Sequence, residues 1–289
     1  MKKDNYKEVK KVLWTILFVN IAVAFTKIVI GLLIKSASLM ADGFHCVSDG
    51  ASNVVGLIGT TIASKPKDRE HPYGHSKFEV ITSMFIGGML VFIGINIILE
   101  AIDRFYSPVV AQIEIQSLVV LFITMIINIV ISKYESKKGK ELGSHILISD
   151  SKHTRSDIFV SVGVILTLIG IKLGLPVVID TIMSVIVAGF ILHASYKIFK
   201  ESIDILVDKK AVDEERIKEI VEQYNEVRGV HNIRSRGSIY DMHIDMHILV
   251  NPYVTTDKAH ELAHEIEDDI NEKLGYNIQV TIHIEPYYE

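Results

Sequence analysis

The stretch Asp42-Gly-Phe-His-Cys-Val-Ser-Asp49 recurs 108 positions later as Asp150-Ser-Lys-His-Thr-Arg-Ser-Asp157, with four of eight positions identical. Each copy contains a histidine followed four residues later by an aspartate: His45 and Asp49, then His153 and Asp157. On a helix, residues four apart lie on one face with Cβ atoms about 5–6 Å apart. Each copy therefore directs an imidazole and a carboxylate toward the same neighbour.

Both copies lie within long apolar segments. The 289-residue chain is 49% hydrophobic with a mean hydropathy of +0.32, which is too apolar for an ordinary soluble domain. Each apolar segment is close to the ~20 residues that span a bilayer. The sequence predicts six transmembrane helices, at 12–34, 37–63, 78–101, 115–132, 145–172 and 177–199.

Lysine and arginine orient these spans. The first eleven residues carry five such residues, and the connections 64–77 and 133–144 carry four each, whereas the alternate connections carry about one each. Positive residues accumulate on the cytoplasmic side. We therefore expect a multi-pass protein of the cell membrane with both termini in the cytoplasm.

This topology places the two His/Asp pairs at the same depth. The second span enters from outside and the fifth from inside, and each pair lies 8 to 12 residues from the point of entry. At 1.5 Å per residue, both pairs lie about 12–18 Å deep in a core of about 30 Å. Ionisable residues at this depth usually mark a substrate path, and two imidazoles with two carboxylates suit a divalent metal. The plainer alternative is that each pair only braces a neighbouring helix.

Other polar residues also lie within the predicted spans. Asp42 and Asp150, one turn before each histidine, either orient the imidazoles or line a solvated access path, and the second reading is preferred. For Lys27 and for three asparagines we expect hydrogen bonds between helices or snorkelling. The asparagines are Asn20, Asn53 and Asn128.

The charge changes sign near residue 207. Residues 207–289 carry a net charge of −9, and residues 1–206 a net charge of +4. We expect a transmembrane domain over 1–206 and a cytoplasmic metal-binding and dimerisation domain over 207–289. An acidic tail repels phosphate backbones, so we expect no nucleic acid as a partner.

Periodicity predicts an αββαβ order in this second domain, a small α+β fold. The helices are expected at 213–226 and 257–274, and the strands at 230–239, 241–250 and 277–285. In the last strand, alternation buries Ile278, Val280, Ile282 and Ile284 and exposes His283 and Glu285.

Two more clusters have metal-ligand chemistry. Asp68, His71 and His75 lie on a short turn with Pro72 and Gly74, which is enough for a partly open three-ligand site, although solvated loop histidines are the alternative. In the tail, His247, His283 and Glu285 share the polar face of adjacent strands. The wider tail cluster adds His231, His243, His260 and His264.

One motif points to a different chemistry. His260-Glu261-Leu262-Ala263-His264 matches the H-E-x-x-H pattern of zinc proteases. The domain is small and has no second lobe to form a cleft, so a metallohydrolase is a weak alternative and we expect no enzyme. A membrane-anchored metal sensor is a second alternative, and it would tolerate Asp49→Ala where a transporter would not.

Taken together, the two HxxxD pairs, the DxxHPYGH loop from Asp68, the six spans and the acidic tail resemble the cation diffusion facilitators along the whole chain. That resemblance implies a homodimer that exports divalent metal in exchange for protons by alternating access. It also implies a regulatory tail site at His231, His247, His283 and Glu285 with His260 bridging, where Glu285 replaces the aspartate of the best-known bacterial member. Lys77 and Asp208 match a charge interlock at the dimer seam.

The resemblance and the donor chemistry also bear on the metal. Imidazole with carboxylate suits zinc, iron and cobalt, while manganese prefers more oxygen ligands. His45 is typical of the zinc-preferring branch. We expect Zn²⁺ as the cargo, followed by Fe²⁺, Co²⁺, Cd²⁺ and Mn²⁺.

Overall fold

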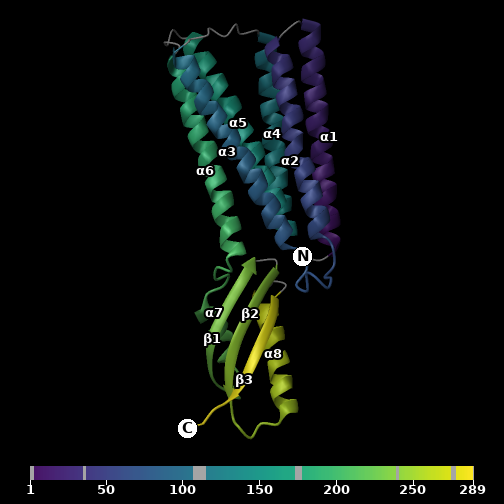
Figure 1. Cartoon of the computed structure of the whole chain (residues 1–289), viewed down its shortest axis with the longest axis vertical. Coiled ribbons are helices and arrows are strands. Elements are labelled where there is room, and N and C mark those ends of the chain that lie inside the picture. The colour runs from purple at the N-terminus through teal and green to yellow at the C-terminus, as the bar shows by residue number, and fades with distance from the viewer. Residues whose placement is uncertain are drawn as a thin grey trace. The chain divides into compact units, whose positions relative to one another are not determined.

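In the residues that it describes, the computed structural model of this chain contains six long helices and a small α+β domain (Figure 1). It describes residues 3–34, 37–106, 115–172, 178–238, 241–274 and 278–288. Within these ranges the side chains of residues 3–4, 31, 33–34, 37–49, 104, 115–118, 164, 167–172 and 178–180 lie outside the description. The chain divides into two compact units, one ending at Ser202 and one beginning at Ile203.

The first unit contains the six helices. Their bounds are α1 Lys3–Ile34, α2 Ala37–Ala63, α3 Lys77–Tyr106, α4 Ile115–Leu142, α5 His145–Lys172 and α6 Val178–Leu206, the last of which continues into the second unit. Several helices are longer than the predicted spans, α4 by ten residues at its carboxyl end. The prediction followed hydropathy, whereas a helix continues past the apolar run wherever its polar residues still favour helix or pack on a neighbour.

Four of these helices are long and apolar enough to cross a membrane: α1, α3, α4 and α6. The described part of α2 adds a shorter apolar helix, Gly50–Ala63. In α5 the first half carries Asp150, Lys152, Arg155 and Asp157, which lowers its hydropathy. A multi-span domain is therefore confirmed, while the full count of six spans stays a prediction.

Large apolar side chains cover the outside of this unit. Phe18, Phe25 and Phe92 are more than 60% exposed, as expected of residues that face lipid. Inside, Leu90 of α3 and Ile191 of α6 belong to one buried cluster, and Ser195 of α6 donates a hydrogen bond of 2.8 Å to the carbonyl oxygen of Gly87 in α3. Apolar packing and polar bonds thus both join the helices.

The amino end of α5 is held by a side chain of α3. Glu79, in the first turn of α3, is 3% exposed, and its carboxylate accepts hydrogen bonds from the hydroxyl of Ser144 and from the backbone N–H of Ile146. Ser144 Oγ in turn accepts the N–H of Leu147 at 3.3 Å. These bonds satisfy N–H groups that the first turn of a helix leaves free.

The second unit is a three-stranded sheet covered on one face by two helices. Its elements are α7 Glu214–Val221, β1 Val227–Ser238, β2 Asp241–Val250, α8 Thr256–Leu274 and β3 Ile278–Pro286. The predicted αββαβ order is confirmed. Strand β2 is central, antiparallel to β1 and parallel to β3, with α8 as the crossover.

The core of this unit comes from its own elements. Alternate residues of β2, including Ile244 and Ile248, are fully buried against Leu262, Ile266 and Ile270 of α8. Because side chains alternate along a strand, the opposite face of the sheet carries the polar residues. All the histidines of the strands lie there.

Helix α7 ends earlier than predicted, at Val221 instead of residue 226. The reason lies at Tyr224, whose ring packs on the core and whose hydroxyl donates a hydrogen bond to the carbonyl oxygen of Glu265 in α8 at 3.1 Å. Burial of the ring raises the pKa of Tyr224. The tertiary contact therefore ends the helix against its local propensity.

Candidate functional site

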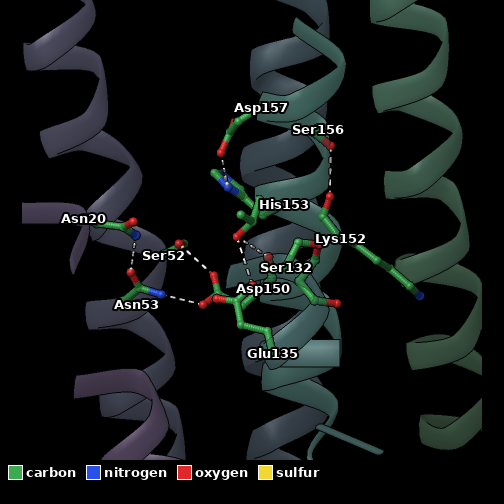
Figure 2. Close-up of polar contacts among 12 residues, drawn as sticks. Asn20, Ser52, Asn53, Ser132, Glu135, Asp150, Lys152, His153, Ser156 and Asp157 are labelled. Carbon is green, nitrogen blue, oxygen red and sulfur yellow. Dashed lines mark hydrogen bonds and ion pairs between the residues drawn. The ribbon is translucent and has the colours of Figure 1, made fainter. Parts of the chain in front are cut away.

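The His153/Asp157 pair of α5 has the geometry that its spacing predicted. The Nδ1 atom of His153 lies 3.8 Å from Oδ2 of Asp157, and the two side chains are 3% and 19% exposed. Figure 2 shows them directed toward one another. The Nε2 atom of His153 is buried without a hydrogen-bond partner in the described structure, so it is available as a metal ligand.

The other predicted pair, His45 and Asp49, lies outside the described side chains, as does Asp42. The helix that carries them, α2, is described from Gly50 onward with its contacts. Ser52 Oγ donates a hydrogen bond of 2.8 Å to Oδ1 of Asp150, and the amide of Asn53 donates to Oδ2. The turn of α2 that follows Asp49 therefore contacts the turn of α5 that precedes His153.

Asp150 is not solvated, contrary to the preferred sequence interpretation. It is 1% exposed, and Ser52 and Asn53 of α2 supply the hydrogen-bond donors to its carboxylate. Its neighbour on α4 is Glu135, which is 0% exposed and accepts a hydrogen bond of 3.0 Å from Thr154 Oγ1. Both acids lie below His153 in Figure 2.

Glu135 was missed because the predicted fourth span ended at residue 132. The signal was the continuing helical spacing of Ser132, Glu135 and Gly139, which are all buried against α5. Ser132 donates a hydrogen bond of 2.9 Å to the carbonyl oxygen of Ser151 on the same face. A polar stripe at intervals of three and four residues marks a packed helix face even outside an apolar run.

A small polar cavity adjoins the His153/Asp157 pair. It is lined by Asn20, Val23 and Lys27 of α1, Ser52 of α2, Thr124 and Asn128 of α4, and His153, Thr154 and Asp157 of α5. Asn20 donates a hydrogen bond of 3.0 Å to Asn53, as expected for asparagines between helices. Lys27 does not snorkel, because it is 4% exposed and faces this cavity.

The loop residues Asp68, His71 and His75 form one cluster whose ligand atoms lie within 4.8 Å of one another. Oδ1 of Asp68 lies 3.1 Å from Nδ1 of His71, and Oδ2 lies 3.4 Å from Nε2 of His75. The backbone N–H of His71 donates to Asp68 at 2.7 Å and is the main cause of a lowered Asp68 pKa. Gly74, with φ +95°, supplies the turn that returns His75 to the cluster.

The tail histidines surround one carboxylate. Glu285 of β3 lies 3.1 Å from Nε2 of His231, 2.8 Å from Nδ1 of His247 and 3.7 Å from Nε2 of His283. The register explains this arrangement, since His231 and His283 are each paired with His247 across the sheet. A bulge with Asn232 at φ +52° follows His231 in β1, and such bulges re-aim neighbouring side chains.

His260 does not join that cluster within this chain. On α8 its Nε2 atom lies 3.1 Å from Nε2 of His264, whose Nδ1 lies 3.0 Å from Glu267. The two histidines of the H-E-x-x-H pattern therefore do share a face, and both are exposed. Asp208 forms an ion pair with Arg236 at 3.5 Å.

Two family models match this sequence. The cation efflux transmembrane domain matches residues 13–207, and the cation efflux protein, cytoplasmic domain, matches residues 210–287. Together they cover nearly the whole chain.

Several curated proteins are similar to it. An uncharacterized transporter of Methanocaldococcus jannaschii is 35% identical over 237 residues, covering 79% of this chain and 81% of that protein. The manganese efflux system protein MneP of Bacillus subtilis is 31% identical over 299 aligned positions, covering both chains completely. The cadmium, cobalt and zinc/H⁺-K⁺ antiporter of Bacillus subtilis is 29% identical over 74% of this chain and 66% of that protein.

Proposed function

This chain belongs to the cation efflux family, whose members are transporters and not enzymes, and we propose that it exports Zn²⁺ through a mid-membrane site of His45, Asp49, His153 and Asp157. The family membership supports divalent metal export in general. It also removes the basis for the metallohydrolase and sensor alternatives as the main activity.

The observation that carries the four-residue site is the register of α2 against α5. Gly56 of α2 faces Ile146 of α5, and further toward the start of α2, Ser52 bonds to Asp150. The helices are therefore antiparallel, and moving back along α2 corresponds to moving forward along α5. Extended by one turn, this register favours position 49 level with position 153, and extended by two turns it favours position 45 level with position 157.

Proton exchange follows from the chemistry of the ligands. Imidazole and carboxylate bind a metal only after losing their protons, so metal and protons compete for the same four groups. With both termini in the cytoplasm, a site open to the inside loads metal, and a site open to the outside releases it as protons bind. Inward protons then drive export.

Zn²⁺ is proposed because two imidazole nitrogens with two carboxylates suit it. Mn²⁺ is the second candidate, and the observation that favours it is the full-length similarity to a protein named as a manganese efflux system. Transport of a panel of ions, Zn²⁺, Mn²⁺, Fe²⁺, Co²⁺ and Cd²⁺, into proteoliposomes decides between them.

The transport test uses purified protein in liposomes that contain a metal-sensitive dye. We expect metal uptake that is driven by a pH gradient, collapses when the gradient is dissipated, and is lost in His153→Ala and Asp157→Asn. Ser156→Ala is the matched control, because Ser156 lies on the same helix and, among the described residues, its hydroxyl bonds only to the Lys152 carbonyl oxygen, at 3.0 Å. Uptake that persists without a gradient refutes the coupling, and uptake by Asp157→Asn refutes the site.

We also propose that the loop and tail clusters bind metal. In the tail, His231, His247 and Glu285 bring ligand atoms within 4.8 Å of one another, and His283 stands beside them. This supports a regulatory site on a cytoplasmic domain, with a homodimer in which His260 approaches the site from the partner chain. Metal-dependent change in the tail's oligomeric state tests it.

A further inference from the structure

Two buried acids lie one turn away from the proposed transport site and are not part of it. Glu135 of α4 is 0% exposed and Asp150 of α5 is 1% exposed. The Thr154 hydroxyl joins the two residues, because it lies 3.0 Å from Oε2 of Glu135 and 3.2 Å from the backbone carbonyl oxygen of Asp150, and both acids lie below His153 in Figure 2. Paired buried acids need a physical explanation, because two charges of the same sign in a dry site are costly.

One carboxyl oxygen of the pair has no hydrogen-bond donor among the described residues. Asp150 accepts from Ser52 and Asn53, and Oε2 of Glu135 accepts from Thr154. Oε1 of Glu135 is fully buried and has no partner among the described residues. An ionised carboxylate can only accept hydrogen bonds, so a proton on one of the two acids removes a charge from a site that does not supply enough donors for both.

Charged groups of two helices lie near the pair. Asp157 and His153 lie further along α5, and Lys27 of α1 lines the cavity that contains Thr154 and Asp157. The negative charge of Asp157 favours a proton on the pair. A dication held by His153 and Asp157 would reverse that balance, because it adds positive charge about one helical turn away.

We propose that Glu135 and Asp150 together form a proton-binding site that exchanges its proton when metal enters or leaves the neighbouring transport site. On metal arrival the O–H bond of the acid pair breaks and the proton passes to water, while the metal bonds to its own ligands. On metal departure the pair takes a proton back. This inference rests on the proposed function, and it adds a proton to those displaced from the ligands themselves.

The position of the pair supports this role. Ser52 and Asn53 join Asp150 to α2, Asn20 continues the chain of bonds to α1, and Glu135 belongs to α4. In the proposed orientation this layer lies on the cytoplasmic side of the metal. Glu135 of α4 also accepts a hydrogen bond from Thr154 of α5, so a change in the charge of the pair acts directly on a contact between these helices.

The test counts protons released when Zn²⁺ binds to the full-length protein in weakly buffered detergent solution. Glu135→Gln keeps the size and hydrogen-bonding capacity of the side chain but cannot ionise. We expect it to bind Zn²⁺ with the same number of ions per chain as the wild type while releasing about one proton fewer. Metal–metal exchange in liposomes without a pH gradient should persist.

Ser132→Ala is the matched control, because Ser132 lies one turn away on the same face of α4 and bonds to α5 without a titratable group. It should release as many protons as the wild type. An equal proton count in Glu135→Gln overturns the inference. A loss of one bound Zn²⁺ per chain also overturns it, since the pair is then a metal site.

Two further measurements cover the case in which Glu135→Gln does not fold. Asp150→Asn should show the same proton deficit. In the unaltered protein, infrared difference spectroscopy should show the carbonyl stretch of a protonated carboxylic acid that disappears on addition of Zn²⁺, and its absence contradicts the proposal. Failure of the wild type to transport any metal, by contrast, rejects the proposed function itself.

Discussion

At the scale of single residues, Glu285 is the centre of the tail cluster. Its two oxygens approach three histidines at 2.8–3.7 Å, so one substitution removes a ligand and the group that fixes the rings. We expect Glu285→Ala to abolish most of the stabilisation by Zn²⁺, which for a bound ligand is about 2.7 kcal/mol at one hundred times its dissociation constant. Thermal unfolding with and without Zn²⁺ measures this.

The control for Glu285 is His264→Ala, which alters an exposed tail histidine that contacts His260 and Glu267 instead. It should keep the Zn²⁺-dependent shift in unfolding temperature. Equal loss in both variants would mean that the tail binds Zn²⁺ diffusely and not at Glu285.

The ionised carboxylate of Asp68 stabilises the loop turn, so the turn should persist until the pH is low enough to protonate it. Its pKa is lowered, chiefly because the N–H of His71 donates to it, so the carboxylate persists below the ordinary value of 3.8. A lowered pKa gives stabilisation that is present above the ordinary value and is lost as pH falls through the lowered one. Slow amide hydrogen exchange at His71 should thus survive mild acid. If the slow exchange were lost near neutral pH, protonation of the histidines and not of Asp68 would control the turn.

At the scale of elements, α2 and α3 approach closely at Gly59. A Cβ there would lie 2.0 Å from Oγ1 of Thr82, whose hydroxyl is bonded to the carbonyl oxygen of Phe78 at 2.7 Å. We expect Gly59→Ala to lower stability by about 1–3 kcal/mol through overpacking. Thermal unfolding in detergent micelles is the measurement.

Gly88 in α3 provides the comparison, because a Cβ there meets nothing within 4 Å. Gly88→Ala should leave the unfolding temperature unchanged or raise it, since alanine is the better helix former by about 1 kcal/mol. Combining Gly59→Ala with Thr82→Ala should recover part of the loss. A lack of recovery would show that the close approach is not the cause.

The elements also show what could be predicted from the sequence. Periodicity located the helices and the αββαβ order, because lipid-facing and core-facing residues repeat at helical or strand spacing. It could not supply the parallel pairing of β2 with β3, which depends on long-range contacts across the α8 crossover. Nor could it foresee that Tyr224 would end α7 by turning to the core.

The sites were predictable to a similar degree. The i,i+4 spacing was enough to place His153 beside Asp157, and the close sequence positions of the loop residues were enough for Asp68, His71 and His75. Glu135 was not predicted, because the lysines around it indicated a solvated loop and not a buried helix face. The burial of Asp150 follows from donors on α2, a helix about one hundred residues earlier in the sequence.

At the scale of the whole molecule, the chain consists of two units with separate cores. Every buried residue of the tail core lies between Ile217 and Ile278. We therefore expect residues 207–289 to fold alone as a soluble domain with a single cooperative thermal transition. Circular dichroism checks this, and a non-cooperative melt would show that the tail depends on the membrane unit. Sedimentation with and without Zn²⁺ then reports whether metal shifts the domain toward a dimer.

The hydrogen bonds of Glu79 connect the loop cluster to the amino end of α5. The loop cluster ends at His75, four residues before Glu79, and the helix held by Glu79 is the one that carries His153 and Asp157. We therefore expect a change in the shape of the loop to shift the amino end of α5, because Glu79 follows the loop directly and bonds to that end.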